Sequence, residues 1–175
     1  MHRFAAVLFL LIPCCANSAV ADSSSGGFTI KLTYLVKAPP AAVYGGFIHN
    51  IGEWWNADHT YSHDSHNLSI DEKPMGCFCE KLPNQGAARH MEVLTLIPGR
   101  ALVLSGALGP LQSLAAVGTL SLQLSPSPEG TKLDVTYALG GYLPSGLNTF
   151  AAPVDSVLQD QFTRLKDFVE RKAAR

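Results

Sequence analysis

Three histidines and two aspartates lie close together in one polar stretch, at Asp58, His59, His63, Asp64 and His66. Imidazole and carboxylate groups are good ligands for zinc or copper. The histidines are spaced by four and then three residues, but no helical pattern surrounds them, so their side chains need not converge. We therefore predict a solvated polar loop here, with a metal site as the less favoured alternative.

Cys77 and Cys79 are separated by one residue in a segment that reads as a strand. On a regular strand their Cα atoms would lie about 6.6 Å apart and their side chains would point the same way. A disulfide needs Cβ atoms about 3.8 Å apart, which parallel side chains do not reach. The pattern predicts free or only partly paired thiols. A disulfide would require a bulge, and metal binding with His90 is the third possibility.

Glu80, His90 and Glu92 could supply acid–base groups if they faced an internal cavity. Strand alternation places Glu80 on the face opposite the two cysteines, and it places His90 and Glu92 together on one face of the next strand. The favoured interpretation is exposed cross-strand polar pairs. The sequence contains no GxSxG, HExxH or phosphate-loop motif.

Trp54 and Trp55 are adjacent. Adjacent side chains point to different sides of a helix or strand. One tryptophan could therefore line a cavity while the other packs elsewhere, or both could be core residues. An indole ring offers a wide apolar face and one N–H donor, which suits an aromatic or sterol-like ligand.

The elements that must position these residues are mostly short strands. Alternating or continuous apolar patterns bounded by turn residues predict seven strands, and the hairpin loops between them are rich in proline, glycine and asparagine. The predicted strands are 28–37, 68–70, 77–82, 90–97, 100–105, 114–124 and 132–139.

Two helical regions complete the chain. Pro39 and Pro40 favour the start of a short helix over 41–50, and a second short segment follows to Trp55. The last segment repeats apolar residues every three or four positions from Val154 to Val169, which predicts a long amphipathic helix. One apolar helix face and a run of hairpins indicate an α+β fold in which a curved antiparallel sheet of about six to seven strands grips the C-terminal helix.

In this order of elements the chain resembles the helix-grip superfamily known as SRPBCC, START or Bet v 1-like. Within it, the chain is most similar to the branch related to activators of the Hsp90 ATPase (AHSA-like). The similarity covers 28 to about 169 and rests on five strings in the same order: VKAPPAAVYGGFIHNIGEWW, PMGCFCEKLP, IPGRALVLSGALGPLQ, EGTKLDVTYALGGY and APVDSVLQDQFTRLKDFV.

The resemblance implies a hydrophobic cavity under the C-terminal helix but no particular reaction. We expect a small hydrophobic ligand there, with no cofactor, no metal and no catalytic residue. The expected ligand-binding residues are Trp54, Trp55, Tyr142, Phe150, Val154, Leu158 and Phe162.

The N-terminus resembles a signal peptide. Arg3 precedes an unbroken apolar run over 4–12, and Ala19-Val20-Ala21 offers a cleavage site. We predict a signal peptide over 1–21, a flexible tether over 22–27 and a single domain over 28–175. The predicted location is periplasmic or secreted, which fits poorly with a cytosolic co-chaperone role. A lipoprotein is disfavoured because Pro13 precedes Cys14.

Composition supports a single globular domain, with 47% hydrophobic and 15% charged residues. The formal net charge is −1 and no basic run occurs, so neither nucleic acid nor an anionic membrane surface is an expected partner. No stable membrane span is expected after the first dozen residues. Three functions stay open: an exported ligand-binding protein, a cyclase- or hydrolase-like enzyme using the same cavity, and a protein-interaction module.

Overall fold

A computed structural model describes residues 19–175 of the chain. The predicted signal peptide lies almost wholly outside the described residues. The core of the fold is one antiparallel sheet of eight strands in the order β1-β2-β8-β7-β6-β5-β4-β3. Its strands are β1 (Val20–Ser24), β2 (Gly27–Val36), β3 (Leu68–Ile70), β4 (Cys77–Leu82), β5 (Gly86–Ile97), β6 (Ala101–Gly106), β7 (Ala115–Ser127) and β8 (Gly130–Tyr142).

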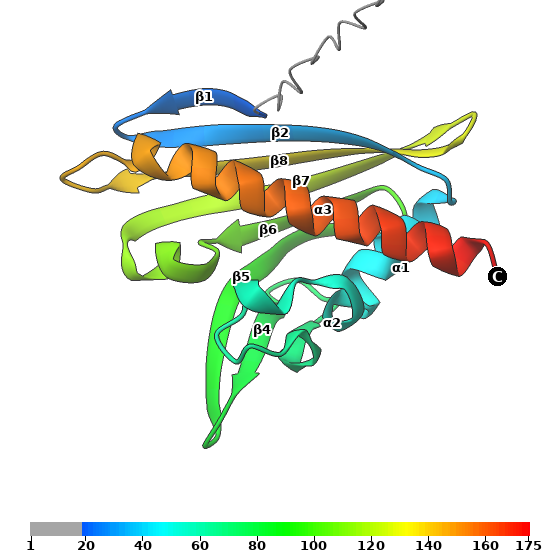
Figure 1. Cartoon of the computed structure of the whole chain (residues 1–175), viewed down its shortest axis with the longest axis horizontal. Coiled ribbons are helices and arrows are strands. Elements are labelled where there is room, and N and C mark those ends of the chain that lie inside the picture. The colour runs from blue at the N-terminus through cyan, green and yellow to red at the C-terminus, as the bar shows by residue number, and fades with distance from the viewer. Residues whose placement is uncertain (1–18) are drawn as a thin grey trace, which may run out of the picture.

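The helices all lie on one side of this sheet. The long helix α3 (Ala151–Ala173) runs across the strands, and the short helices α1 (Pro40–His49) and α2 (Ile51–Trp54) lie beside its second half (Figure 1). Alternation along the strands turns one apolar row toward the helices, as in β8, where Leu133, Val135, Tyr137 and Leu139 are buried. The sequence-based prediction of an α+β sheet gripping a C-terminal helix is therefore confirmed.

The sheet has one strand more than the predicted six to seven, because residues expected to be a tether pair with β2. Asp22, Ser23 and Ser24 lie opposite Thr29, Phe28 and Gly27 in a hairpin. The prediction of a flexible tether over 22–27 is thus wrong. Serine-rich polar segments are typical of linkers, but an edge strand with one exposed face can have the same composition.

The second half of α3 is held by close packing against α1. Phe162 is fully buried, and its ring stacks on that of Phe47 with centroids 6.1 Å apart. A side chain at Gly46 would place its Cβ 2.6 Å from Val169, so glycine is required for this approach. At Phe162 and Val169 this half of the helix is therefore in close contact with α1.

Within residues 19–175, no helix is long and apolar enough to cross a membrane.

Candidate functional site

A cavity of about 350 Å³ lies beneath the first half of α3. Its walls come from α3, from strands β3 to β5, from the loop that follows α2, and from the connection between β6 and β7, which contains the 3-10 helix η3 (Gly109–Ser113). Most of the wall is apolar. The lining residues are Trp55, Asp58, His59, Thr60, Tyr61, Leu68, Phe78, His90, Leu108, Gly109, Pro110, Leu111, Phe150, Pro153, Val154, Val157 and Leu158.

The cavity exists because the two halves of α3 meet different neighbours. The second half packs on α1, whereas the first half borders the cavity. Val154, Val157 and Leu158 cover the space from above. Lining residues that are themselves exposed, Asp58 and Pro153 among them, mark its mouth.

Four of the residues expected to bind a ligand line this cavity. Phe150, Val154 and Leu158 contribute from the start of α3 and the turn before it. Trp55 contributes an indole ring from the end of α2, and its N–H donates to the backbone oxygen of His59 at 3.3 Å. These residues meet because the C-terminal helix and the segment after α2 converge over β3 and β4.

The other three expected residues do not line the cavity. Trp54 points into the core, where its indole N–H donates to the Gly46 oxygen at 2.8 Å. Phe162 lies farther along α3, in the filled half of the helix–sheet interface. Tyr142 is 72% exposed at the end of β8. Two features of the sequence indicate that Tyr142 is exposed: it follows two glycines, and it lies beyond the last residue of the alternating apolar pattern in this strand.

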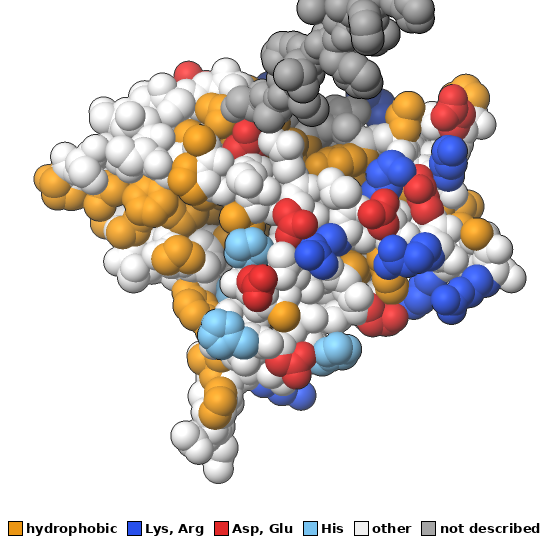
Figure 2. Space-filling view, viewed as in Figure 1, with side chains coloured by type: hydrophobic (Ala, Val, Ile, Leu, Met, Phe, Trp, Pro, Cys, Tyr) orange, Lys and Arg blue, Asp and Glu red, His pale blue; other side chains and the backbone are white. Residues whose placement is uncertain are grey.

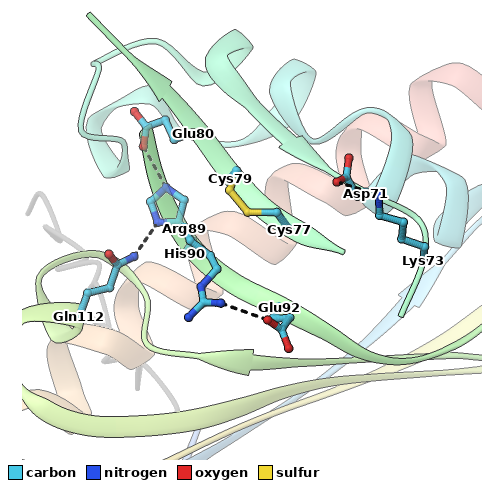
Figure 3. Close-up of a disulfide and its surroundings, with 9 residues drawn as sticks. All are labelled: Asp71, Lys73, Cys77, Cys79, Glu80, Arg89, His90, Glu92 and Gln112. Atoms are coloured by element: carbon cyan, nitrogen blue, oxygen red, sulfur yellow. Dashed lines mark hydrogen bonds and ion pairs between the residues drawn. A yellow bond between two sulfur atoms is a disulfide. The ribbon is translucent and has the colours of Figure 1, made fainter. Parts of the chain in front are cut away.

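The buried carboxylate of Glu80 contacts two residues of the cavity wall, Tyr61 and His90. It is fully buried and accepts hydrogen bonds from the backbone N–H groups of Tyr61 and Ser62, at 3.1 and 2.5 Å. Its Oε2 also lies 2.9 Å from Nε2 of His90, which is 5% exposed and lines the cavity (Figure 3). The pair ties the loop after α2 to strands β4 and β5.

The surroundings of this pair fix its protonation. Burial raises the pKa of Glu80, but hydrogen bonds from Ser62, Tyr61 and His90 outweigh it and hold the pKa below its usual value. Burial lowers the pKa of His90 and outweighs the opposing effect of Glu80. Glu80 is therefore an acceptor, His90 is neutral and carries its proton on Nε2, and Nδ1 is left with a lone pair. That lone pair faces the amide nitrogen of Gln112, 3.2 Å away.

His90 faces inward because β5 bulges at this residue. Cys77, Phe78 and Cys79 of β4 lie opposite Glu92, Met91 and Arg89, so His90 has no partner in the ladder. Regular alternation, which predicted that His90 and Glu92 share a face, fails here. Glu92 points to the other side of the sheet and pairs with Arg89 at 3.0 Å (Figure 3).

Cys77 and Cys79 form a disulfide, so the prediction of free thiols is wrong. Their Cα atoms are 5.3 Å apart, closer than the spacing of a regular strand. The local shortening of β4 coincides with the extra residue in β5. A disulfide was expected to require a bulge, and β4 and β5 do have an irregularity at this point.

The histidine-rich loop does not gather into a metal site. Within the described part of the chain, no three His, Cys, Asp or Glu side chains are placed to hold an ion. His66 pairs with Asp64 at the surface, at 2.9 Å. His59 stands at the cavity mouth, and Tyr61 stacks on His90 with ring centroids 5.7 Å apart. The loop therefore serves as a wall of the cavity.

Comparison with known proteins identifies the architecture. No protein-family model and no curated protein matches the chain. Ara h 8.0201, however, superposes with a TM-score of 0.59 at 12% identity, over 82% of this chain and 98% of that one. The chain has the Bet v 1-like helix-grip fold.

Other solved structures share this helix-grip fold. SA2116 from Staphylococcus aureus, a protein of unknown function, matches with a TM-score of 0.62 at 12% identity, over 85% of this chain and 97% of that one. An Aha1 dimer from Colwellia psychrerythraea matches with a TM-score of 0.55 at 18% identity, over 81% and 96% of the two chains. At these identities the similarity shows the fold alone.

Several lining residues were not predicted from the sequence. Val157 belongs to the apolar face of the last helix, and its spacing from Val154 was a usable signal. Leu108 and Leu111 come from a glycine- and proline-containing connection, which carries no periodic pattern. Thr60 and Tyr61 lie in the polar loop, where tertiary contacts such as the hydrogen bond from the Tyr61 N–H to Glu80 place them beside the cavity.

Proposed function

We propose that this protein binds a small hydrophobic molecule in the cavity beneath the first half of α3. The observation that carries the proposal is the cavity itself, about 350 Å³ with mostly aliphatic and aromatic walls. Ligand sites in proteins are concave, largely apolar and of about 300 Å³ or more, with a few placed polar groups. A filled core would have favoured a protein-interaction module instead.

A pair of neighbouring substitutions on α3 tests this function. Val157 lines the cavity, whereas Ser156 is exposed on the other side of the helix. Val157→Trp should fill the space and abolish binding of a neutral solvatochromic dye such as Nile red. Ser156→Trp adds the same ring outside the cavity and should bind the dye as the parent protein does. Equal dye binding by both variants would refute the cavity as the binding site.

A second candidate function is a reaction in the same cavity, because the Glu80–His90 pair faces inward. A carboxylate that orients a neutral imidazole is an arrangement used in general base catalysis. In the structure, however, the free lone pair of His90 faces the Gln112 amide, not a nucleophilic side chain. Conversion of a bound compound by the parent protein but not by His90→Phe would favour the enzyme over the binding protein.

We also propose that the protein is exported and cleaved after Ala21. The apolar run over 4–12 and the small residues Ala19 and Ala21 support this, as does the Cys77–Cys79 disulfide, since such bonds persist in oxidising compartments. Cleavage there would remove Val20 and Ala21 from β1. N-terminal sequencing of protein recovered from cells should begin at Asp22, and a sequence beginning at Met1 would exclude export.

For its place within the superfamily, we propose the branch related to activators of the Hsp90 ATPase. The strings PMGCFCEKLP and IPGRALVLSGALGPLQ support this placement, together with the fold shared with the Aha1 dimer. An alignment of homologues that groups the chain with another branch would contradict it.

A further inference from the structure

The side-chain hydrogen-bond donors of Trp55, Thr60, Tyr61 and His90 in the cavity wall are already used. The indole of Trp55 and the hydroxyls of Thr60 and Tyr61 each donate to a backbone oxygen, at 3.3, 2.7 and 2.7 Å. Nε2 of His90 donates to Glu80. Pro153, at the start of α3, has no N–H to offer. A ligand that needs donors from the wall, such as a carboxylate, would therefore find few.

The wall does offer an acceptor. Glu80 already accepts hydrogen bonds from two backbone N–H groups, and an ionised carboxylate has no proton to donate. Nε2 of His90 must therefore carry the proton in its bond to Glu80, so the lone pair of the neutral imidazole is on Nδ1. The partner of Nδ1 is the amide of half-buried Gln112, and at 3.2 Å that bond is at the long end of the usual range. Gln112 lies on the short 3-10 helix η3, next to the lining residue Leu111, and we expect its amide to give way to a ligand group.

The charged side chains around the cavity also disfavour an anionic ligand. Neither lysine nor arginine is among the lining residues, whereas Asp58 stands at the mouth and ionised Glu80 lies directly behind His90. Figure 2 shows the lysine and arginine side chains gathered around the second half of α3, with apolar side chains around its beginning. An anion would enter past these carboxylates, and no lysine or arginine in the lining would receive it; the basic side chains there are His90 and, at the exposed mouth beside Asp58, His59.

The rings of Trp55, Phe78, Phe150 and Tyr61 line the cavity from several sides, together with a larger number of aliphatic side chains. Aromatic faces arranged around one space favour a flat, unsaturated molecule, because rings pack edge to face or offset against one another. Resting on the proposed ligand-binding function, we propose that the ligand is an uncharged aromatic molecule that donates a hydrogen bond, from a hydroxyl or N–H group, to Nδ1 of His90.

Four matched probes test this ligand class on the unaltered protein: 2-naphthol, 2-methoxynaphthalene, naphthalene and 2-naphthoate, titrated by calorimetry at neutral pH. They share one ring system and differ in donor and charge. We expect 2-naphthol to bind roughly tenfold more tightly than 2-methoxynaphthalene or naphthalene, the effect of one buried hydrogen bond. We expect 2-naphthoate to bind most weakly.

The outcomes separate the two proposals. Equal affinity for 2-naphthol, 2-methoxynaphthalene and naphthalene would overturn the donor inference and leave the binding function standing. Tightest binding of 2-naphthoate would overturn it as well, because it would require an anion site. Binding of none of the four would contradict both the binding function and the ligand class.

Two variants locate the hydrogen bond. His90→Phe removes Nδ1 and should abolish the preference for 2-naphthol over 2-methoxynaphthalene, provided that circular dichroism shows a native fold. Gln112→Ala removes the amide that competes for Nδ1, so it should keep or increase the preference. Loss of the preference in Gln112→Ala together with its retention in His90→Phe would place the acceptor elsewhere and overturn the assignment.

Discussion

Oε2 of Glu80 lies 2.9 Å from Nε2 of His90, and both side chains are shielded from solvent. The carboxylate comes from β4 and the imidazole from the bulge of β5, while the backbone N–H groups of Tyr61 and Ser62 in the cavity loop donate to Oε2 and Oε1 of Glu80. One buried carboxylate thus ties the sheet to the cavity wall. It also sets which nitrogen of His90, the residue that we expect to face the ligand, carries the proton.

Glu80→Gln should destabilise the protein by about 2–4 kcal/mol. The amide replaces one acceptor oxygen by a donor that faces N–H groups, which leaves buried polar groups unpaired. Glu92→Gln is the matched control, because Glu92 pairs with Arg89 at the surface on the other side of the sheet, and its loss should cost at most about 1 kcal/mol. Urea denaturation measures both, and equal costs would contradict the role given to Glu80.

Acid should destabilise the fold through His90. Its pKa is lowered from the ordinary 6.5 by burial, despite Glu80, so below pH 6.5 the unfolded chain takes up a proton that the folded chain refuses. The free energy of unfolding should therefore fall as the pH drops below 6.5, and protonation of Glu80, whose pKa is also lowered, extends the loss to lower pH. His90→Phe should reduce the slope just below pH 6.5.

The surface histidines His49 and His66 are present in both proteins, so the difference between the two pH profiles isolates His90. Parallel profiles for the parent protein and His90→Phe would show that His90 is protonated equally readily in the folded and unfolded states.

The disulfide should be detectable by peptide mapping without reduction. Trypsin should release both cysteines in one peptide, lighter by two hydrogens than its reduced form. Replacing both by serine should cost on the order of 1–2 kcal/mol, because the bond closes a very short loop, with a sequence separation of 2. It should also shift the NMR signals of the His90 ring, since the bulge lies opposite the disulfide. Two free thiols in that peptide would contradict the structure.

The elements were predictable from the sequence because their signals are local. Strands β3 and β4 begin and end at the predicted residues, and the apolar spacing from Val154 to Val169 marks most of α3. The site was only half predictable. Trp55 and Trp54 are chemically identical neighbours, and only the direction in which α2 ends decides which one reaches the cavity.

The bulge at His90 has no local signal in the sequence either. It arises from a cross-strand relationship with Cys77 and Cys79, whose shortened spacing requires an extra residue in the neighbouring strand. Prediction by regular alternation therefore placed His90 on the same face as Glu92 and gave no indication that His90 contacts Glu80. For the same reason β1 was missed, since its pairing with β2 depends on a partner and not on its own composition.

The grip of α3 on the sheet should depend on Phe162. Its ring is fully buried against Phe47 and does not line the cavity beneath the first half of α3, so Phe162→Ala should cost about 3–5 kcal/mol of folding stability. Phe150→Ala is the comparison, because Phe150 is half-buried and borders space that already exists. It should cost less than Phe162→Ala in thermal or chemical denaturation. A Phe162→Ala cost below about 1 kcal/mol would mean that the helix does not grip the sheet.

The position of a bound ligand tests the account most directly. In a solution NMR experiment with methyl-labelled protein and 2-naphthol, we expect intermolecular nuclear Overhauser contacts from the ligand to Val154, Val157 and Leu158, which line the cavity. Val117 and Leu94 are exposed methyl-bearing residues elsewhere on the protein and should show none. Contacts to Val117 or Leu94 without contacts to Val154, Val157 and Leu158 would contradict a ligand site beneath α3.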